Sequence, residues 1–181
     1  MDDSPLIPSQ VVAQRRNRFL VRRGWKRLAV ALPLAVICTF VVLGILFGIA
    51  STRGSSMNPT LGAGDKILFS RRGDYTRGDI VIFRADAAYA DDYIKRIVGL
   101  PGDTVDMDDA GRVLLNGAVL NEPYARGFTE KKSTLTYPIT LQSDEYFVLG
   151  DARENSQDSR NFGAVHQSRL VGKLITVLRM K

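Results

Sequence analysis

Two residues of this chain have the chemistry of a nucleophile and its base. Ser56 lies in a segment rich in turn-forming residues, and Lys95 lies in an apolar stretch, residues 93–98. A serine hydroxyl needs a base before it can attack a carbonyl group, and a lysine that has lost its proton can serve as that base. The chain holds one histidine and one cysteine, so the other common activating groups are nearly absent. The residue types therefore favour a hydrolase built on a serine and a lysine.

The pattern around Lys95 suggests how this lysine could lose its proton. If residues 93–98 form a strand, Lys95 shares one face with Tyr93 and Ile97, and Arg96 lies on the other face with Ile94 and Val98. Burial against apolar neighbours lowers the pKa of an amine. Neutralising a lysine of pKa ~10.4 at pH 7 costs about 4.6 kcal/mol, so the site must be dry. Two simpler interpretations stay open, namely a lysine that faces solvent and a plain turn around Ser56.

A third polar segment, residues 150–163, is dense in Asp, Asn, Ser and Arg. It fits a surface loop held by Asp–Arg pairs. It also fits a structured loop that brings hydroxyls and ion pairs to a catalytic site. Both interpretations stay open from the composition alone.

Neither the histidine nor the cysteine supports a metal or redox site. Cys38 lies inside a long apolar stretch and has no second cysteine to pair with. His166 lies outside the three polar segments, and we expect it at the surface or at a strand end. No Cys/His set can bind zinc, and we expect no cofactor or metal.

The positive charge of the chain is concentrated before an apolar segment. Residues 1–27 hold seven Arg or Lys against two Asp, residues 28–50 hold no charge, and residues 51–181 hold 18 basic and 17 acidic side chains. A nucleic-acid-binding face would place its charge on the folded part. This distribution instead indicates the basic flank of a membrane segment, so nucleic acid is excluded as a partner.

Residues 28–50 are predicted to form a transmembrane helix. Twenty-three helical residues rise about 34 Å, which is enough for a hydrocarbon core of ~30 Å. The stretch is longer than the apolar part of a cleavable signal peptide, and it lacks the polar face of a soluble helix. Because positive charge is retained on the cytoplasmic side, residues 1–27 are predicted to be cytoplasmic, with the first 14 or so unstructured, and residues 51–181 to lie across the membrane.

Beyond residue 50 the apolar runs are short, rich in Val, Ile, Phe and Tyr, and bounded by Gly, Asp and Pro. This is typical of β-strands. Asn116-Gly117 predicts a type I′ hairpin turn. The expected fold class is a mainly antiparallel β domain after a single transmembrane helix. The predicted strands are Lys66–Phe69, Asp79–Phe83, Tyr93–Val98, Val113–Leu115, Tyr146–Leu149 and Leu170–Leu178.

Four segments, in this order, resemble the type I signal peptidases, a family of Ser/Lys proteases. The likeness covers nearly all of residues 28–181, and the four motifs together are specific. They are Ser56-Met57-Asn58-Pro59-Thr60-Leu61, Arg77-Gly78-Asp79-Ile80-Val81, residues 93–103 from Tyr93-Ile94-Lys95 to Pro101-Gly102-Asp103, and residues 150–160 from Gly150-Asp151 to Ser159-Arg160.

The resemblance implies a role for each matching residue. Ser56 would be the nucleophile, Lys95 the general base, and Ser156 the serine that hydrogen-bonds to the lysine and orients it. A supporting ion pair is implied between Asp158 and Arg160. The remaining implied residues are Asp151 and Arg153, which belong to the same motif, and the substrate-pocket candidates Leu61, Tyr93 and Ile94.

The same resemblance implies the fold, the substrate and the location. The fold would be a coiled antiparallel β domain with an apolar surface near the lipid bilayer. The substrates would be exported preproteins, cut after small residues at positions −1 and −3, and the enzyme would lie in the plasma membrane with its catalytic domain outside the cytoplasm. Two alternatives remain, a specialised pilin-maturation peptidase of conjugative transfer and a catalytically inactive, membrane-tethered binding domain.

This chain departs from the family's common pattern at two positions. Ala152 stands where asparagine is common, a tolerable change. Gly54 stands where many members have a serine or threonine that helps to bind the oxyanion. If residues 54–56 are extended, a serine at 54 would lie on the same face as Ser56. We then expect a Gly54→Ser variant to be at least as active as wild type, unless the glycine is needed for a positive φ.

Overall fold

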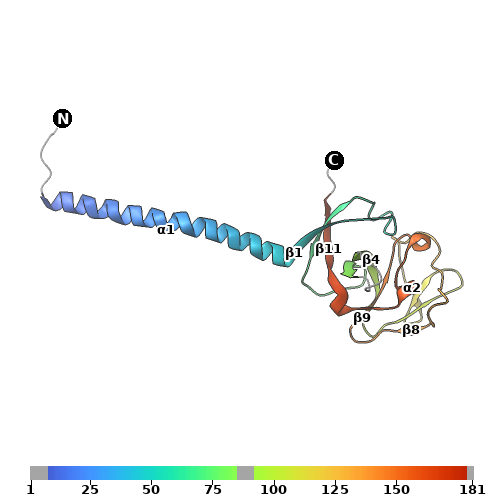
Figure 1. Cartoon of the computed structure of the whole chain (residues 1–181). Helices are drawn as coiled ribbons and strands as arrows, with labels where there is room; N and C mark the ends of the chain where they lie inside the picture. Colours follow the sequence, from blue (N-terminus) through green and yellow to red (C-terminus); the bar gives the residue numbers. More distant parts are fainter. Residues whose placement is uncertain (1–7, 85–91, 179–181) are drawn as a thin grey trace. The chain divides into compact units, whose positions relative to one another are not determined.

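The structure, a computed structural model, describes residues 8–84 and 92–178. The chain divides into two compact units, Met1–Ile45 and Leu46–Lys181 (Figure 1). Helix α1, Pro8–Leu46, makes up the described part of the first unit. The second unit is built almost entirely from β-strands.

Helix α1 contains one segment, Leu28–Leu46, that is long and apolar enough to cross a membrane. The helix extends further towards the N-terminus than the predicted span and ends before its predicted C-terminal end. The helix begins at Pro8, so residues 8–14 are helical, whereas residues 1–7 lie outside the described part. It ends at Leu46 rather than Ala50, because residues 47–51 pair with the strand Lys66–Ser70. A β-ladder with a distant segment has here outweighed local helix propensity.

The β unit consists of two antiparallel sheets joined by loops and short helical turns. The larger sheet has the strand order β1-β2-β11-β3-β4-β9-β10, and the smaller has the order β7-β6-β5-β8. This confirms the expected fold class. The strands are β1 Phe47–Ser51, β2 Lys66–Ser70, β3 Ile80–Arg84, β4 Asp92–Gly99, β5 Thr104–Met107, β6 Val113–Leu115, β7 Ala118–Val119, β8 Ile139–Thr140, β9 Glu145–Leu149, β10 Val165–His166 and β11 Leu170–Leu178, and the helical turns are η1 Arg153–Asn155, α2 Ser159–Phe162 and η2 Gln167–Arg169.

The predicted strands are confirmed to within one residue at most ends. The hairpin is confirmed too, because Asn116 and Gly117 both have positive φ, 51° and 82°, and Leu115 pairs with Ala118. Four strands were not predicted: β1, β5, β8 and β10. Three of these have only two to four residues and mix polar with apolar side chains, and β1 lies inside an apolar run that favours a helix.

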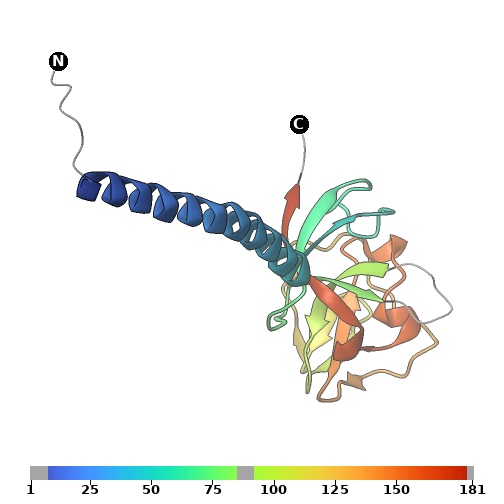
Figure 2. The same ribbon diagram turned by 60° about the vertical axis from the view of Figure 1, so that its left-hand side comes forward.

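Strand β11 ties the two ends of the β unit together. It pairs with β2 on one side and with β3 on the other. In Figure 2 it is the red strand lying among strands drawn in cyan and green. Strand β4 pairs with β3 on one side and with β9 on the other, so it is an interior strand of the sheet. Lys95 lies on this strand.

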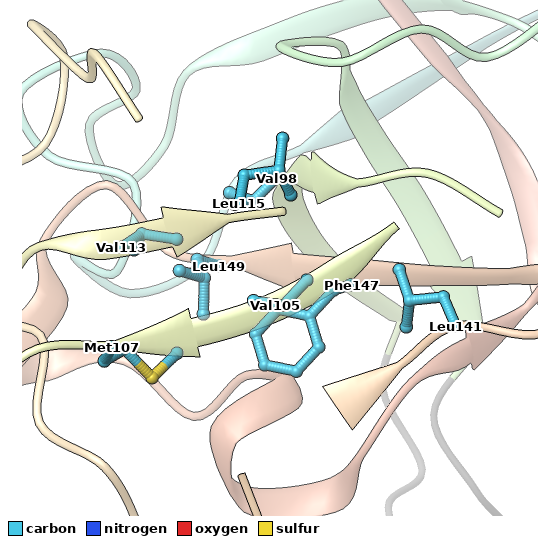
Figure 3. Packing of buried hydrophobic residues seen from close by; sticks show 8 residues of the cluster. All are labelled: Val98, Val105, Met107, Val113, Leu115, Leu141, Phe147 and Leu149. Carbon is cyan, nitrogen blue, oxygen red and sulfur yellow. The ribbon is translucent and has the colours of Figure 1, made fainter. Parts of the chain in front are cut away.

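Apolar side chains from both sheets form the core. One cluster joins the end of β4 and β9 to β5 and β6 of the smaller sheet, and includes Val98, Val105, Phe147 and Leu149, all fully buried (Figure 3). A second cluster contains Met57 and Leu61 from the segment after β1. Because this second cluster anchors residues 57–61, the core itself holds Ser56 against the sheet.

Candidate active site

Ser56 lies in a tight turn rather than in a strand. Backbone hydrogen bonds close the turn from Asn58 N to Ser55 O (3.0 Å) and from Leu61 N to Met57 O (2.9 Å). Met57 and Leu61 are 4% and 1% exposed, so they fasten the turn to the core and leave Ser56 at its partly exposed rim. The assumption that residues 54–56 are extended is therefore wrong. The Ser55 hydroxyl accepts a hydrogen bond from Asn155 Nδ2 (2.8 Å).

Lys95 reaches Ser56 from strand β4. Its side chain is buried, with 3% of the residue exposed, and its Nζ lies 2.7 Å from Ser56 Oγ. Burial lowers the pKa of Lys95 to about 8, although the charges of Asp158 and Asp151 act in the opposite direction. Its Nζ also lies 5.3 Å from the centre of the Tyr93 ring. Both cations of β4 lie against an aromatic ring, since Arg96 Cζ is 4.1 Å from the centre of the Tyr124 ring, but Lys95 is the one that reaches Ser56.

A cleft of about 630 Å³ opens over Ser56 and Lys95. The three substrate-pocket candidates, Leu61, Tyr93 and Ile94, all line it. Sequence reasoning did not single out several other lining residues. Of these, Thr52 is buried and donates a hydrogen bond to Gly62 O, and Gln157 accepts one from the Tyr93 hydroxyl (3.4 Å). The position of Gln157 between Ser156 and Asp158 was the only available signal for it.

Gly54 adopts a left-handed backbone conformation, with φ of 75°. A side chain at this position would meet no neighbouring atom within 4 Å. Space therefore does not require a glycine here, but φ does, since residues with a Cβ rarely adopt this conformation. Gly54 therefore meets the condition under which a serine at this position is expected to be unfavourable, namely a positive φ.

Ser156 lies close to Gly150, next to the backbone oxygen of Ser56. Its Oγ is buried and has no hydrogen-bond partner among the described residues, so the bond to Lys95 implied by the resemblance is not formed. The Oγ lies against Gly150, where a Cβ would come within 2.2 Å of it and within 2.6 Å of Ser56 O. Gly150 is therefore required by close approach, and it brings Ser156 and the Ser56 backbone together.

Asp158 and Arg160 form the implied ion pair, and both are buried. Arg160 Nε donates to Asp158 Oδ1 (2.8 Å) and Arg160 Nη2 donates to Oδ2 (2.9 Å). Asp158 Oδ2 also accepts from Gly150 N (3.1 Å). Asp158 is the N-cap of α2 in a capping box with Asn161. This pair therefore fixes both the helical turn and the backbone next to Ser156.

Asp151 and Arg153 do not pair with each other. Asp151 accepts from Arg96, with Nε–Oδ1 and Nη2–Oδ2 distances of 2.9 and 2.6 Å, and from the Thr60 hydroxyl (2.5 Å). Arg153 pairs with Glu122 (2.6 Å). Sequence reasoning had placed Arg96 on the face of β4 opposite Lys95, but it missed the partners Glu122 and Thr60, which no local pattern marks.

His166 lies on β10, away from the cleft lining, and its side chain is 52% exposed. Its Nδ1 is 3.1 Å from Asp144 Oδ2. This agrees with the expectation of a strand end at the surface. Within residues 8–84 and 92–178, no group of three or more His, Cys, Asp or Glu side chains is arranged to hold a metal ion.

Comparison with known proteins identifies the family of this chain. Residues 25–178 match the family model described as signal peptidase, peptidase S26. The chain belongs to this signal peptidase family. It is 35% identical to signal peptidase I of Bacillus licheniformis over 154 residues, which cover 78% of this chain and 82% of that protein. It is 36% identical to signal peptidase I P of Bacillus subtilis subsp. natto over 156 residues, with the same coverage of both chains.

A crystal structure of a signal peptidase I from Enterococcus faecalis aligns with 32% identity and a TM-score of 0.48, covering 57% of this chain and 98% of that one. Membership of the signal peptidase family confirms the predicted enzyme class, a peptidase and hence a hydrolase. Family membership therefore indicates that this chain is a peptidase that removes signal peptides.

Proposed function

We propose that this chain removes signal peptides from exported preproteins with Ser56 as nucleophile and Lys95 as general base. The observation that carries the proposal is the 2.7 Å separation of Lys95 Nζ and Ser56 Oγ at a cleft lined by both residues. A general base must lie within about 2.6–3.2 Å of the group whose proton it takes. The inactive alternative would lack such a pair.

In the first step, Ser56 Oγ attacks the scissile carbonyl carbon while neutral Lys95 takes the hydroxyl proton. The C–N bond then breaks, and the protonated amine gives its proton to the leaving nitrogen. In the second step a water molecule loses a proton to Lys95 and attacks the ester carbon. Ser56 Oγ leaves and recovers its proton, which regenerates the enzyme.

The environment of Lys95 makes the neutral form accessible near neutral pH. With a pKa of about 8, roughly one lysine in ten is neutral at pH 7. Forming the neutral base then costs about 1.4 kcal/mol, far less than for a solvated lysine. Burial lowers the pKa of Lys95, and the negative charges of Asp158 and Asp151 limit how far it falls.

Backbone N–H groups near Ser56 are proposed to bind the oxyanion, since Gly54 has no side chain to donate. The left-handed conformation of Gly54 sets the path of the backbone into the turn. Preorganised backbone donors can stabilise a tetrahedral intermediate as side chains do.

Ser156, Asp158 and Arg160 are proposed as support for the dyad, together with Asp151 and Arg153. Specificity for small residues at −1 and −3 is proposed from the family resemblance and from the lining of the cleft. The cleft is lined by side chains of Leu61, Tyr93 and Ile94. Such a lining suits an extended substrate segment with short side chains.

We further propose that α1 anchors the enzyme in the plasma membrane. The basic residues before Leu28 would keep the N-terminus cytoplasmic, and the β unit would face preproteins as they emerge on the other side. The lipid bilayer would then be a partner of the apolar segment Leu28–Leu46.

Cleavage of a model preprotein by the full-length chain, with the new N-terminus mapped, tests the proposal. Ser56→Ala and Lys95→Ala should each reduce cleavage by at least about 10³-fold while the fold is retained, because the members of such a unit are not separable. Ser55→Ala is the matched control, and we expect it to stay within about tenfold (~1.4 kcal/mol of barrier). Near-normal turnover by either dyad variant would rule out the mechanism, and a cut only in pilin precursors would favour the specialised alternative.

A further inference from the structure

Glu122 is a buried carboxylate that neither the proposed mechanism nor the family resemblance uses. It follows the hairpin β6–β7, and its side chain is 8% exposed. An ionised carboxylate in such a place needs partners, and Glu122 has two. Arg153 binds it through both guanidinium termini, with Nη2–Oε1 and Nη1–Oε2 distances of 2.6 and 3.1 Å. The Tyr124 hydroxyl donates to Oε1 (3.0 Å).

The carboxylate thereby holds Arg153 in one orientation. Arg153 is 2% exposed, and its Nε donates a hydrogen bond to Gly150 O (3.0 Å). Its Nη1 also donates to the Thr129 hydroxyl (2.7 Å). The planar guanidinium has a fixed fork of donors, so anchoring one end on Glu122 sets where the other end meets Gly150.

Gly150 and its neighbours connect this ion pair to the nucleophile. Ala152 N donates to Ser56 O (3.0 Å), and Gly150 packs against both Ser56 O and the Ser156 hydroxyl. The backbone adds a parallel tie, because Arg126 N donates to Asp151 O (2.7 Å) and Arg153 N donates to Arg126 O (2.8 Å). The segment that carries Glu122 is thus fastened twice to the loop that touches Ser56.

We propose that Glu122 is a positioning residue of the catalytic reaction, which acts through Arg153 on the loop 150–153 and so on Ser56. This inference rests on the proposed function of Ser56 and Lys95. Glu122 is not one of the residues that line the cleft, so its proposed effect on the reaction is exerted through Arg153. Its loss should affect the chemical step and leave substrate binding largely unchanged. A misplacement of ~1 Å at a reacting group can lower the rate about 10²-fold.

The test compares full-length wild type, Glu122→Gln, Glu122→Asp and the control Glu130→Gln on a peptide substrate, with kcat and KM measured separately. Glu130 lies in the same segment and pairs with Lys132 (2.6 Å), but its side chain is 64% exposed. Below the melting temperature of each variant, we expect Glu122→Gln to lower kcat by about tenfold or more, with KM within twofold. Glu122→Asp should recover part of the loss, and Glu130→Gln should stay within twofold of wild type.

A second variant separates positioning from stability. Replacing a buried ion pair with apolar side chains of similar volume often preserves the fold, so Glu122→Leu/Arg153→Met should fold while losing the hold on Gly150 O. We expect the same selective drop in kcat. A folded Glu122→Gln or double variant with kcat within twofold of wild type would overturn the inference. Ser56→Ala is assayed alongside, because cleavage that survives in that variant would instead reject the proposed function.

Discussion

At the scale of single residues, two opposing effects set the pKa of Lys95, the proposed general base. Burial favours the neutral amine, whereas Asp158 and Asp151 favour the ammonium ion. Burial is the larger effect, so the pKa falls, but only to about 8. The two carboxylates are themselves paired with Arg160 and Arg96. These arginines reduce the pull of the carboxylates on the lysine proton.

This opposition predicts the pH dependence of the reaction. Only neutral Lys95 can take the proton of Ser56, so kcat/KM should rise with pH and reach half its plateau near pH 8, the pKa of Lys95. Below that value the rate should fall about tenfold per pH unit. Measuring kcat/KM of the folded enzyme from pH 6 to pH 10 checks this. An acidic limb near the ordinary lysine value of 10.5 would mean that Lys95 is solvated and is not the base.

At the scale of elements, the site is made where a turn, a strand and a loop meet. The turn after β1 carries Ser56, β4 carries Lys95, and the loop after β9 packs against both through Gly150. Two glycines make this meeting possible for different reasons. Position 54 needs a glycine because its backbone is left-handed. Position 150 needs a glycine because a side chain there would collide with Ser156 and the Ser56 backbone.

Gly54→Ser should impair the enzyme, despite adding a hydroxyl near the oxyanion. A residue with a Cβ pays ~1–2 kcal/mol in the left-handed region, and φ of 75° at Gly54 lies there. The turn should relieve this strain by shifting Ser56, so we expect kcat/KM to fall about tenfold. Gly54→Asn, which tolerates positive φ better, should be milder. Steady-state kinetics decide the matter, and a Gly54→Ser variant as fast as wild type would mean that the added donor outweighs the strain.

Gly150→Ala should damage both the fold and the reaction. The new methyl would lie 2.2 Å from Ser156 Oγ and 2.6 Å from Ser56 O, and the second of these atoms belongs to the backbone. Overpacking of this kind costs ~1–3 kcal/mol, and the displaced Ser56 should lower kcat about 10²-fold.

Gly62→Ala is the matched control for Gly150→Ala. A Cβ on Gly62 would have its nearest neighbour at 3.8 Å, so activity and melting temperature should change little. Thermal melting and kinetics on the same preparations test both variants. Equal behaviour of the two would contradict the close approach at Gly150.

At the scale of the whole molecule, the chain combines an apolar helix with a nearly neutral β unit. The positive charge that gives the chain its net +6 lies almost entirely before Leu28. In the proposed membrane-anchored enzyme, such a distribution would set the orientation of the helix. The proposed catalytic residues, Ser56 and Lys95, both belong to the second unit, Leu46–Lys181.

The charge distribution predicts the topology of the enzyme in the cell. Protease added outside spheroplasts should digest the β unit, whereas residues 1–27 should be digested only after the membrane is opened. Epitope tags at the two ends of the chain, followed on blots, provide the measurement. Digestion of the β unit from the cytoplasmic side alone would contradict both the orientation and a role in export.

The sequence by itself determined the features that depend on local patterns. Short apolar runs bounded by Gly, Asp and Pro predicted most of the strands, Asn116-Gly117 predicted its hairpin, and the uncharged run predicted an apolar helix. Residue types alone suggested Ser56 and Lys95, since the chain offers few other activating groups. The predictions of strands, hairpin and helix succeeded because each depends on the periodicity or the chemistry of neighbouring residues, whereas the catalytic roles of Ser56 and Lys95 stay predictions.

The tertiary structure alone decided which distant groups meet. Residues 47–51 became β1 because they pair with β2, although their own sequence favours continuing the helix. Arg153 found Glu122, 31 residues away, rather than the nearer Asp151. Gly54 proved to be left-handed because the following turn is anchored by Met57 and Leu61 in the core. Such choices are made by pairing and packing between segments far apart in the chain, and no local pattern records them.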